Sequence, residues 1–180
     1  MTDNKLKLNK DKSKLMVRYK PGDNKDDATI TAHGKEIKPQ NDMKVLGLYL
    51  SSNRDWTQKI NETVKQLQLR LITLRQLAAA GSQKTISSLA SSIIIGKIVY
   101  RIQAWGGTTL ENRMKLQKMI NQSARIALGP RSYKMPVKSM MEILDWSSFG
   151  QLKNQHTLNL AISTVSNQKQ ISLITRLNRF

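Results

Sequence analysis

The spacing of the apolar residues changes once along this 180-residue chain, near Asp55. Before that point, short apolar runs alternate with polar residues and end at Pro or Gly, a pattern typical of β-strands. After it, apolar residues recur at intervals of three and four, which is the period of amphipathic helices. The sequence therefore predicts an α+β fold, with short antiparallel strands over residues 1–54 and a larger helical bundle over residues 55–180.

Strand candidates occur in three places before Asp55. Residues 14–19 alternate between apolar and polar side chains. Residues 28–32 and 36–39 flank a glycine, Gly34, and this arrangement predicts a hairpin with a glycine turn. Residues 44–50 are apolar almost throughout, so we expect one strand that is buried on both faces.

The helical part is divided by capping and breaking residues. Asp55 is the expected N-cap of the first helix, which ends at Gly81, and Ser82 is the expected cap of the second. Thr108 is expected to cap the third helix. The second helix has apolar residues on more than one stripe, so we expect it to be the central helix. The predicted helices cover approximately residues 55–80, 83–105, 108–128, 136–144 and 148–166.

The charge balance indicates a polyanionic partner. The chain has 30 Lys and Arg against 12 Asp and Glu, a formal net charge of +18. Most of the excess falls in residues 58–180, which hold eighteen basic and four acidic side chains. A positive excess of this size attracts polyanions, of which nucleic acid is the commonest. The alternative is a basic surface that has no dedicated partner.

Several function classes are excluded or disfavoured by residue content. The chain has no cysteine and two histidines, which excludes a disulfide scaffold, a Cys-based zinc module and a multi-His metal site. Asp26 and Asp27 are adjacent, but a polar loop is a poor support for a two-metal site. No apolar run reaches the length of a signal peptide or a membrane span, so we expect a soluble intracellular protein without a membrane partner. The sequence predicts no catalytic residue and no metal or cofactor bound by this chain.

Five short segments, taken in their order along the chain, form one recognisable pattern. They are NKLKLNKDKSKLM at residues 4–16, KVLGLYLSSNRDW at 44–56, IVYRIQAWG at 98–106, LQKMINQSAR at 116–125 and ILDW at 143–146. In this order they resemble the reverse transcriptases of non-LTR (LINE-type) retrotransposons. The first two segments are similar to motif D and to the primer-grip region of the palm, and the other three are similar to the thumb. The resemblance covers residues 4–165 and implies the C-terminal edge of the palm followed by the thumb of an RNA-directed DNA polymerase.

The resemblance implies roles for individual residues of the N-terminal part. Lys12 is similar to the motif D lysine that lies near the incoming nucleotide, and Asn9 would support the turn before it. Lys44, Leu46 and Gly47 match the primer-grip strand, in which a glycine allows the backbone to approach the primer end.

Further candidates are cations from which phosphate contacts are expected. The resemblance implies that the basic helices hold an RNA or RNA–DNA duplex through its backbone, independent of sequence. Solvated helix faces are an alternative of equal weight. The candidates are Lys10 and Lys14 beside the strands, and Arg70, Arg75, Lys84, Lys97 and Arg101 on the helices.

The catalytic centre of the resembled family has no counterpart in residues 1–180. In that family, Mg²⁺ is held by an Asp of an early palm strand and by a Tyr-x-Asp-Asp hairpin, both of which precede motif D. We therefore expect part of a polymerase whose palm and fingers on the N-terminal side are missing, with Mg²⁺ required by the full-length enzyme. The alternatives are a stand-alone nucleic-acid-binding protein derived from such an element and a decayed copy without function.

The polypeptide of residues 1–180 is expected to give no primer extension. With Mg²⁺, dNTPs and a primed RNA template, product should stay at the level of the blank, because paired carboxylates that hold the metal ions are missing. A full-length LINE-type reverse transcriptase assayed in parallel serves as the positive control. Extension above the blank by this chain would contradict the interpretation.

Overall fold

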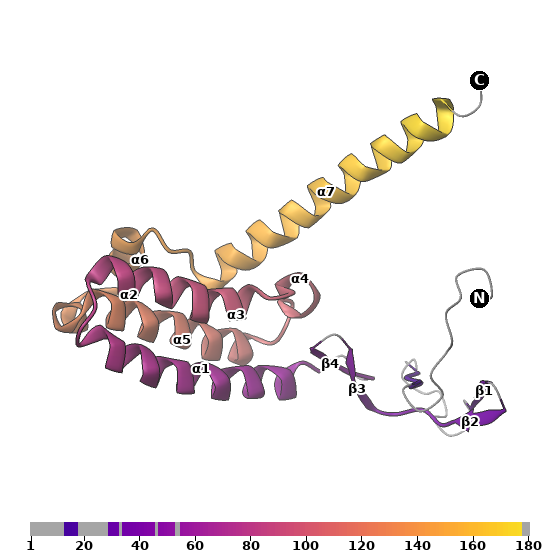
Figure 1. The fold of residues 1–180 in the computed structure, drawn as a ribbon, viewed down its shortest axis with the longest axis horizontal. Helices are drawn as coiled ribbons and strands as arrows, with labels where there is room; N and C mark the ends of the chain where they lie inside the picture. The colour runs from indigo at the N-terminus through magenta and orange to yellow at the C-terminus, as the bar shows by residue number, and fades with distance from the viewer. Residues whose placement is uncertain (1–12, 18–28, 33, 46, 53–54, 178–180) are drawn as a thin grey trace. The chain divides into compact units, whose positions relative to one another are not determined.

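The computed structural model describes residues 13–17, 29–32, 34–45, 47–52 and 55–177, with the side chains of residues 32, 35, 49 and 167–177 excepted. The chain divides into two compact units, Met1–Lys59 and Ile60–Phe180. Strands occur in the first unit, and the second is helical (Figure 1). The predicted α+β class and the order of strands before helices are therefore confirmed.

Two antiparallel hairpins make up the described strands of the first unit. The strands are β1 (Ile30–Ala32), β2 (Lys35–Ile37), β3 (Asp42–Val45) and β4 (Leu48–Ser51). Pairing of β1 with β2 across Gly34 confirms the predicted glycine hairpin. The strand predicted over residues 14–19 is reduced, within the described residues 13–17, to an isolated bridge between Leu15 and Pro39.

The single strand predicted over residues 44–50 is wrong. The backbone turns at Gly47, which has a φ of +80°, and Val45 pairs with Leu48 across a two-residue loop. Glycine adopts a positive φ without steric cost, so this apolar run supplies parts of two strands instead of one. Burial on both faces is also wrong, because Leu48 is buried whereas Lys44 and Val45 are exposed.

The helices follow from Thr57 onward. They are α1 (Thr57–Ala78), α2 (Gln83–Ala90), the π-helix η2 (Ser91–Ile95), α3 (Gly96–Val99), α4 (Ile102–Trp105), α5 (Leu110–Leu128), the 3₁₀ helix η3 (Pro130–Lys134), α6 (Val137–Leu144) and α7 (Phe149–Leu177). Helix α5 contacts α2, η2, η3, α6 and α7. Residues 83–105, predicted to be central, pack against α5 through α2 and η2, so the two regions share the centre of the helical unit.

Of the three predicted helix caps, Ser82 is confirmed, and Asp55 lies one residue before the N-cap position of α1 but still bonds its first turn. The Oδ1 atom of Asp55 accepts a hydrogen bond from the backbone N–H of Thr57 at 2.9 Å. Hydrogen bonds from the side chain and then the backbone of Thr57 lower the pKa of Asp55, because they favour its charged form. Likewise, the Oγ atom of Ser82 accepts from the backbone N–H of Thr85 at 3.2 Å, at the start of α2.

The predicted cap of the third helix is displaced by one residue. Thr109, and not Thr108, accepts from the backbone N–H of Asn112 at 3.4 Å. The hydroxyl of Thr108 is instead buried and accepts from the side-chain amide of Asn112 at 3.0 Å. A run of two threonines offers the helix two adjacent caps, and burial of Thr108 decides between them.

The helix predicted over residues 83–105 is interrupted twice. It widens into a π-helix at η2 and breaks between α3 and α4, where Arg101 has a φ of +55°. At this break, the indole N–H of Trp105 donates to the backbone carbonyl of Tyr100 at 2.9 Å. The apolar stripe continues through both interruptions. Its buried members are Ile86, Ala90, Ile94, Ile95, Ile98, Ile102 and Trp105.

The core of the helical unit combines this stripe with one face each of α1 and α5. On α1, Ile60, Leu67, Leu71 and Leu74 recur at helical spacing and are buried. On α5 the buried apolar residues are Leu116, Met119, Ile120, Ala124 and Ala127. Leu110 and Met114, which also fit the helical spacing of apolar residues, lie outside that face and are 70% and 64% exposed.

Helix α7 starts at the bundle and continues beyond the predicted end at residue 166. Its first turn packs into the core through Phe149 and Leu152, and the ring of Phe149 lies 6.0 Å from that of Trp105. Over the described parts of the chain, every helix is too short or too polar to cross a membrane.

Replacing Gly129 with alanine is expected to destabilise the helical unit. Gly129 ends α5 with φ +76° and ψ −166°, a combination that is essentially restricted to glycine. We expect Gly129→Ala to lower the free energy of unfolding by about 1–3 kcal/mol. Denaturant unfolding followed by circular dichroism measures the change.

Gly107→Ala is the matched control. A Cβ at Gly107 would meet nothing within 4 Å, and its φ is outside the positive range. We expect a change within about 0.5 kcal/mol for this variant. Equal stability of the two variants would show that the end of α5 does not require glycine.

Candidate nucleic-acid interface

The candidate residues near the strands fall into two groups. Lys14 and Lys44 are described and exposed, and Gly47 is exposed at the turn between β3 and β4. The turn requires a positive φ at position 47, and this accounts for the glycine there. The four others, Asn9, Lys10, Lys12 and Leu46, lie outside the described residues.

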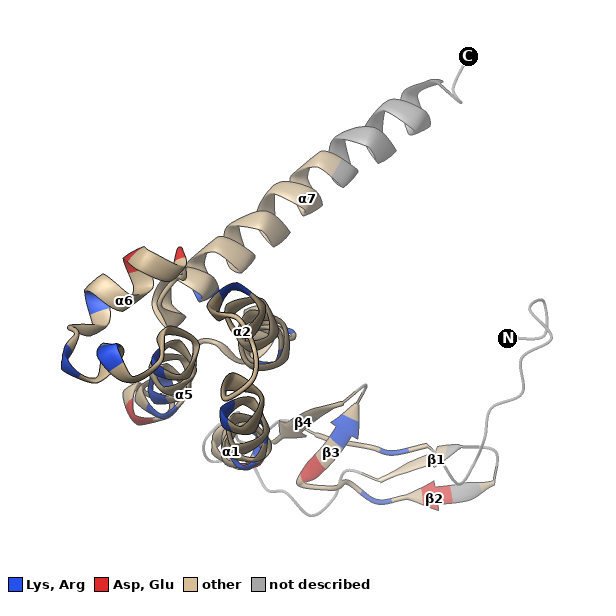
Figure 2. Cartoon of the chain, turned by 60° about the vertical axis from the view of Figure 1, so that its left-hand side comes forward, with Lys and Arg blue, Asp and Glu red and all other residues tan. Residues whose placement is uncertain are grey.

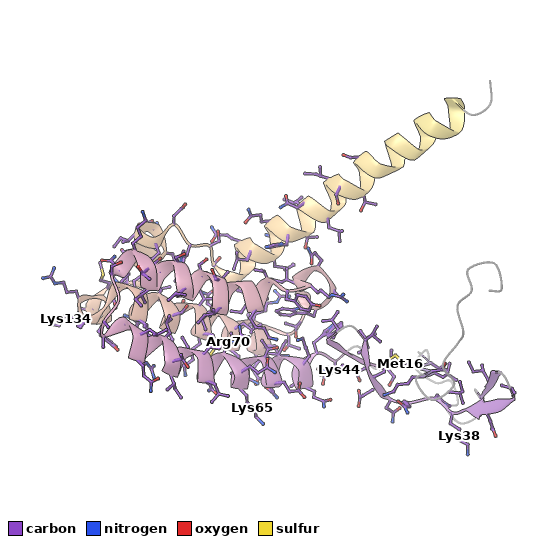
Figure 3. All side chains as sticks on the ribbon, viewed as in Figure 1. Met16, Lys38, Lys44, Lys65, Arg70 and Lys134 are labelled. Carbon is purple, nitrogen blue, oxygen red and sulfur yellow. The ribbon has the colours of Figure 1, made fainter. Side chains whose placement is uncertain are left out.

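Arg70 has a partner within the fold. Its guanidinium, half-buried on α1, donates from Nη1 to the backbone carbonyl of Ile93 at 2.6 Å (Figure 3). Ile93 lies inside η2, where the change from the α-helical to the π-helical pattern disturbs the regular backbone hydrogen bonding. Arg70 therefore joins α1 to this irregular segment, and at least one of its donors is not available to a phosphate.

Arg101 and Lys97 flank the break between α3 and α4. Arg101 is half-buried, and its guanidinium carbon lies 5.4 Å from the ring centroid of Tyr100, a cation–π geometry. Lys97 is half-buried on α3. Lys97, on α3, and Arg101, at the break, are thus placed away from Arg75 of α1 along the chain.

Lys84 borders a groove of about 720 Å³ between α2 and the end of α6. The groove also contains Asp145, whose negative charge opposes the binding of an anion there. Its other lining residues are Gln83, Ser87, Ser88, Ser91, Ser92, Ile143, Leu144 and Trp146.

Arg75 borders a second pocket, of about 460 Å³, together with Lys118 and Arg125 of α5. Because none of the described residues around it is acidic, three cations face one opening without a carboxylate among them. We call this site the basic pocket. Its remaining lining residues are Asn121, Gln122, Ile126, Tyr133 and Val137.

The end of α5 holds Arg125 in place. Its Nη1 atom donates to the backbone carbonyl of Ser132 in η3. In return, the Oγ atom of Ser132 contacts the carbonyls of Arg125 at 3.0 Å and Gly129 at 2.6 Å. Ser132 is fully buried, so the turn after α5 is tied to the helix that carries the cation. This fixed guanidinium loses little conformational freedom when it binds a ligand.

The helical unit has far more basic than acidic side chains. Residues 60–180 contain seventeen Lys and Arg and four Asp and Glu. Two ion pairs, Lys115 with Glu111 at 2.8 Å and Lys138 with Glu142 at 4.0 Å, neutralise cations away from the basic pocket. Figure 2 shows basic positions on α1, α5 and α6 and on the segment that joins α5 to α6. Four carboxylates leave most of these cations uncompensated.

Sequence reasoning identified Arg75 but missed Lys118 and Arg125. These two residues are seven positions apart, which is two helical turns, and so they lie on one face of α5. Asn121 and Gln122 stand between them, which gives a polar stripe at helical spacing opposite the buried one. That stripe is the signal that the sequence offers, and it falls within the segment at 116–125 that resembles the thumb.

No metal site is visible in the part of the chain that the structure describes, where no three His, Cys, Asp or Glu side chains gather. No protein-family model, curated protein or solved structure matches this chain. The chemistry of the basic pocket is therefore derived from its own residues.

Replacing Arg70 with methionine is expected to destabilise the helical unit. Met keeps an unbranched stem but removes the donor to the Ile93 carbonyl, and a hydrogen bond to a charged group contributes about 1.5–3 kcal/mol. Lys65→Met on the exposed side of the same helix is the control, with an expected change within about 0.5 kcal/mol. Denaturant unfolding compares the two variants. If both unfold at the same denaturant concentration, Arg70 does not support η2.

Proposed function

We propose that this chain binds RNA or an RNA–DNA duplex through the basic pocket, as the palm edge and thumb of a LINE-type reverse transcriptase. The observation that carries this proposal is the convergence of Arg75, Lys118 and Arg125 on one pocket whose described lining contains no carboxylate.

Phosphate oxygens match the chemistry of these three side chains. A guanidinium offers paired N–H donors that fit two oxygens of one phosphate, and an ammonium adds a compact positive charge. Contacts of this kind position a nucleic-acid strand without reading its bases. Such binding suits a surface that must follow any template.

The polymerase part of the proposal is supported by the five segments that resemble the family and by the order of strands before helices. In this proposal the β3–β4 hairpin with Lys44 belongs to the palm edge, and the helices from α1 onward belong to the thumb. The palm and fingers that carry the catalytic carboxylates, and with them Mg²⁺, are supplied by the remainder of the polymerase. The chain itself contributes binding.

Binding to an RNA–DNA duplex should weaken as salt increases, because phosphate contacts release counterions. Removing two of the three pocket cations with Arg75→Gln and Lys118→Gln should reduce the magnitude of the log–log salt slope by about two. Fluorescence anisotropy with a labelled duplex, recorded at several salt concentrations, measures both the affinity and the slope.

The matched control removes two predicted cations that lie elsewhere, with Lys84→Gln and Lys97→Gln. This variant has the same net charge but an intact basic pocket, so it should bind more tightly than the pocket variant. Equal losses of affinity in the two variants would show that binding depends on the overall charge. A greater loss of affinity in the control would place the interface on α2 and α3. Absence of salt-sensitive binding by the unaltered chain would refute the proposed function.

A further inference from the structure

The side-chain amide of Asn121 is oriented by a short relay of hydrogen bonds. The backbone N–H of Phe149, the first residue of α7, donates to the Oε1 atom of Gln117 at 2.8 Å. The Nε2 atom of Gln117 then donates to the Oδ1 atom of Asn121, also at 2.8 Å. Asn121 in turn lines the basic pocket, whereas Gln117 does not.

This relay has only one consistent direction. A backbone N–H can donate but cannot accept, so the atom of Gln117 that faces Phe149 is the oxygen. The other atom of the Gln117 amide is therefore the nitrogen, and the atom of Asn121 that meets it is an oxygen. As a result, the Nδ2 amide of Asn121, which is a donor, is the group that can bind a ligand in the pocket.

We infer that the basic pocket is a site for one phosphate group, in which Gln117 keeps Asn121 as a donor beside the cations of Arg75, Lys118 and Arg125. A guanidinium and an ammonium carry donors and no acceptor, so these four side chains present donors alone. A phosphate group, with acceptor oxygens on every side, is complementary to such a set. This inference rests on the proposed function, because the phosphate is taken to belong to the bound strand.

The pocket also has room for more than the phosphate. Its volume of about 460 Å³ exceeds that of a single oxyanion and is within the range of small-ligand sites. Tyr133 lines it and is 69% exposed, so its ring offers a flat apolar surface beside the cations. A sugar or base next to the bound phosphate can rest on this ring.

The first experiment uses inorganic phosphate and the full chain. In ¹⁵N NMR spectra, phosphate should shift the side-chain amide signals of Asn121. Gln117→Glu should abolish this shift, because a carboxylate can still accept from Phe149 but cannot donate to Asn121, which then turns its oxygen toward the pocket. Gln155→Glu, on the exposed part of α7, adds the same charge and should leave the shift unchanged. A missing shift in the unaltered chain, or a shift retained by Gln117→Glu, overturns the inference.

The second experiment measures affinity for an RNA–DNA duplex. Asn121→Asp keeps the oxygen that accepts from Gln117 but replaces the pocket donor with an anionic acceptor, and we expect about a tenfold or greater loss of affinity. Asn154→Asp, on the exposed face of α7, is the control of equal charge. Thermal unfolding of both variants identifies any loss of folding. Equal affinities of the two folded variants overturn the inference.

Duplexes with 5′-hydroxyl and 5′-phosphate ends distinguish the two sources of the phosphate. If Asn121→Asp loses affinity for both duplexes, the pocket binds an internal phosphodiester. If it loses affinity only for the 5′-phosphorylated duplex, the pocket binds a strand end. The proposed function and the inference can fail separately. Tight duplex binding with equal Asn121→Asp and Asn154→Asp affinities removes only the inference, whereas a phosphate-induced shift of Asn121 without duplex binding removes the proposed function and leaves the pocket as a phosphate site that no nucleic-acid strand occupies.

Discussion

The packing of α5 is the constraint on which the rest of the helical unit depends. One face of this helix is buried through Leu116, Ile120 and Ala124, and the helix contacts α2, η2, η3, α6 and α7. Because that face is fixed in the core, the direction of the opposite side chains is fixed as well. Lys118 and Arg125 thereby reach one pocket with Arg75 of α1. The core thus determines the electrostatics of the surface.

The sequence predicts the strongly periodic elements well. Ile60, Leu67, Leu71 and Leu74 recur at helical spacing and are buried as expected. Local capping is also readable, since Asp55 and Ser82 bond the backbone of the turn that follows each of them. The failures come where two local choices have similar free energies and packing selects one. Thr109 caps α5 instead of Thr108, which is drawn into the interior by Asn112.

The breaks within the second predicted helix follow the same logic. The run from Ile86 to Trp105 satisfies a helical pattern and contains no proline, so nothing local predicts the π-helix at η2 or the positive φ of Arg101. A side chain hydrogen-bonds the backbone at each irregularity. Arg70 of α1 donates to the Ile93 carbonyl, and the Trp105 indole donates to the Tyr100 carbonyl. Arg70, which the sequence suggests as a phosphate contact, thus donates a hydrogen bond to the backbone within the fold.

The basic pocket could not be derived from sequence because its parts are far apart along the chain. Arg75 and Lys118 lie on different helices, and the donor state of Asn121 depends on a backbone N–H of α7. Three cations around one opening repel each other. The hydrogen bonds from Arg125 to Ser132 and from Gln117 to Asn121 help to hold these groups in place despite that repulsion. A bound phosphate reduces this repulsion, so the charge of the pocket favours an anionic ligand.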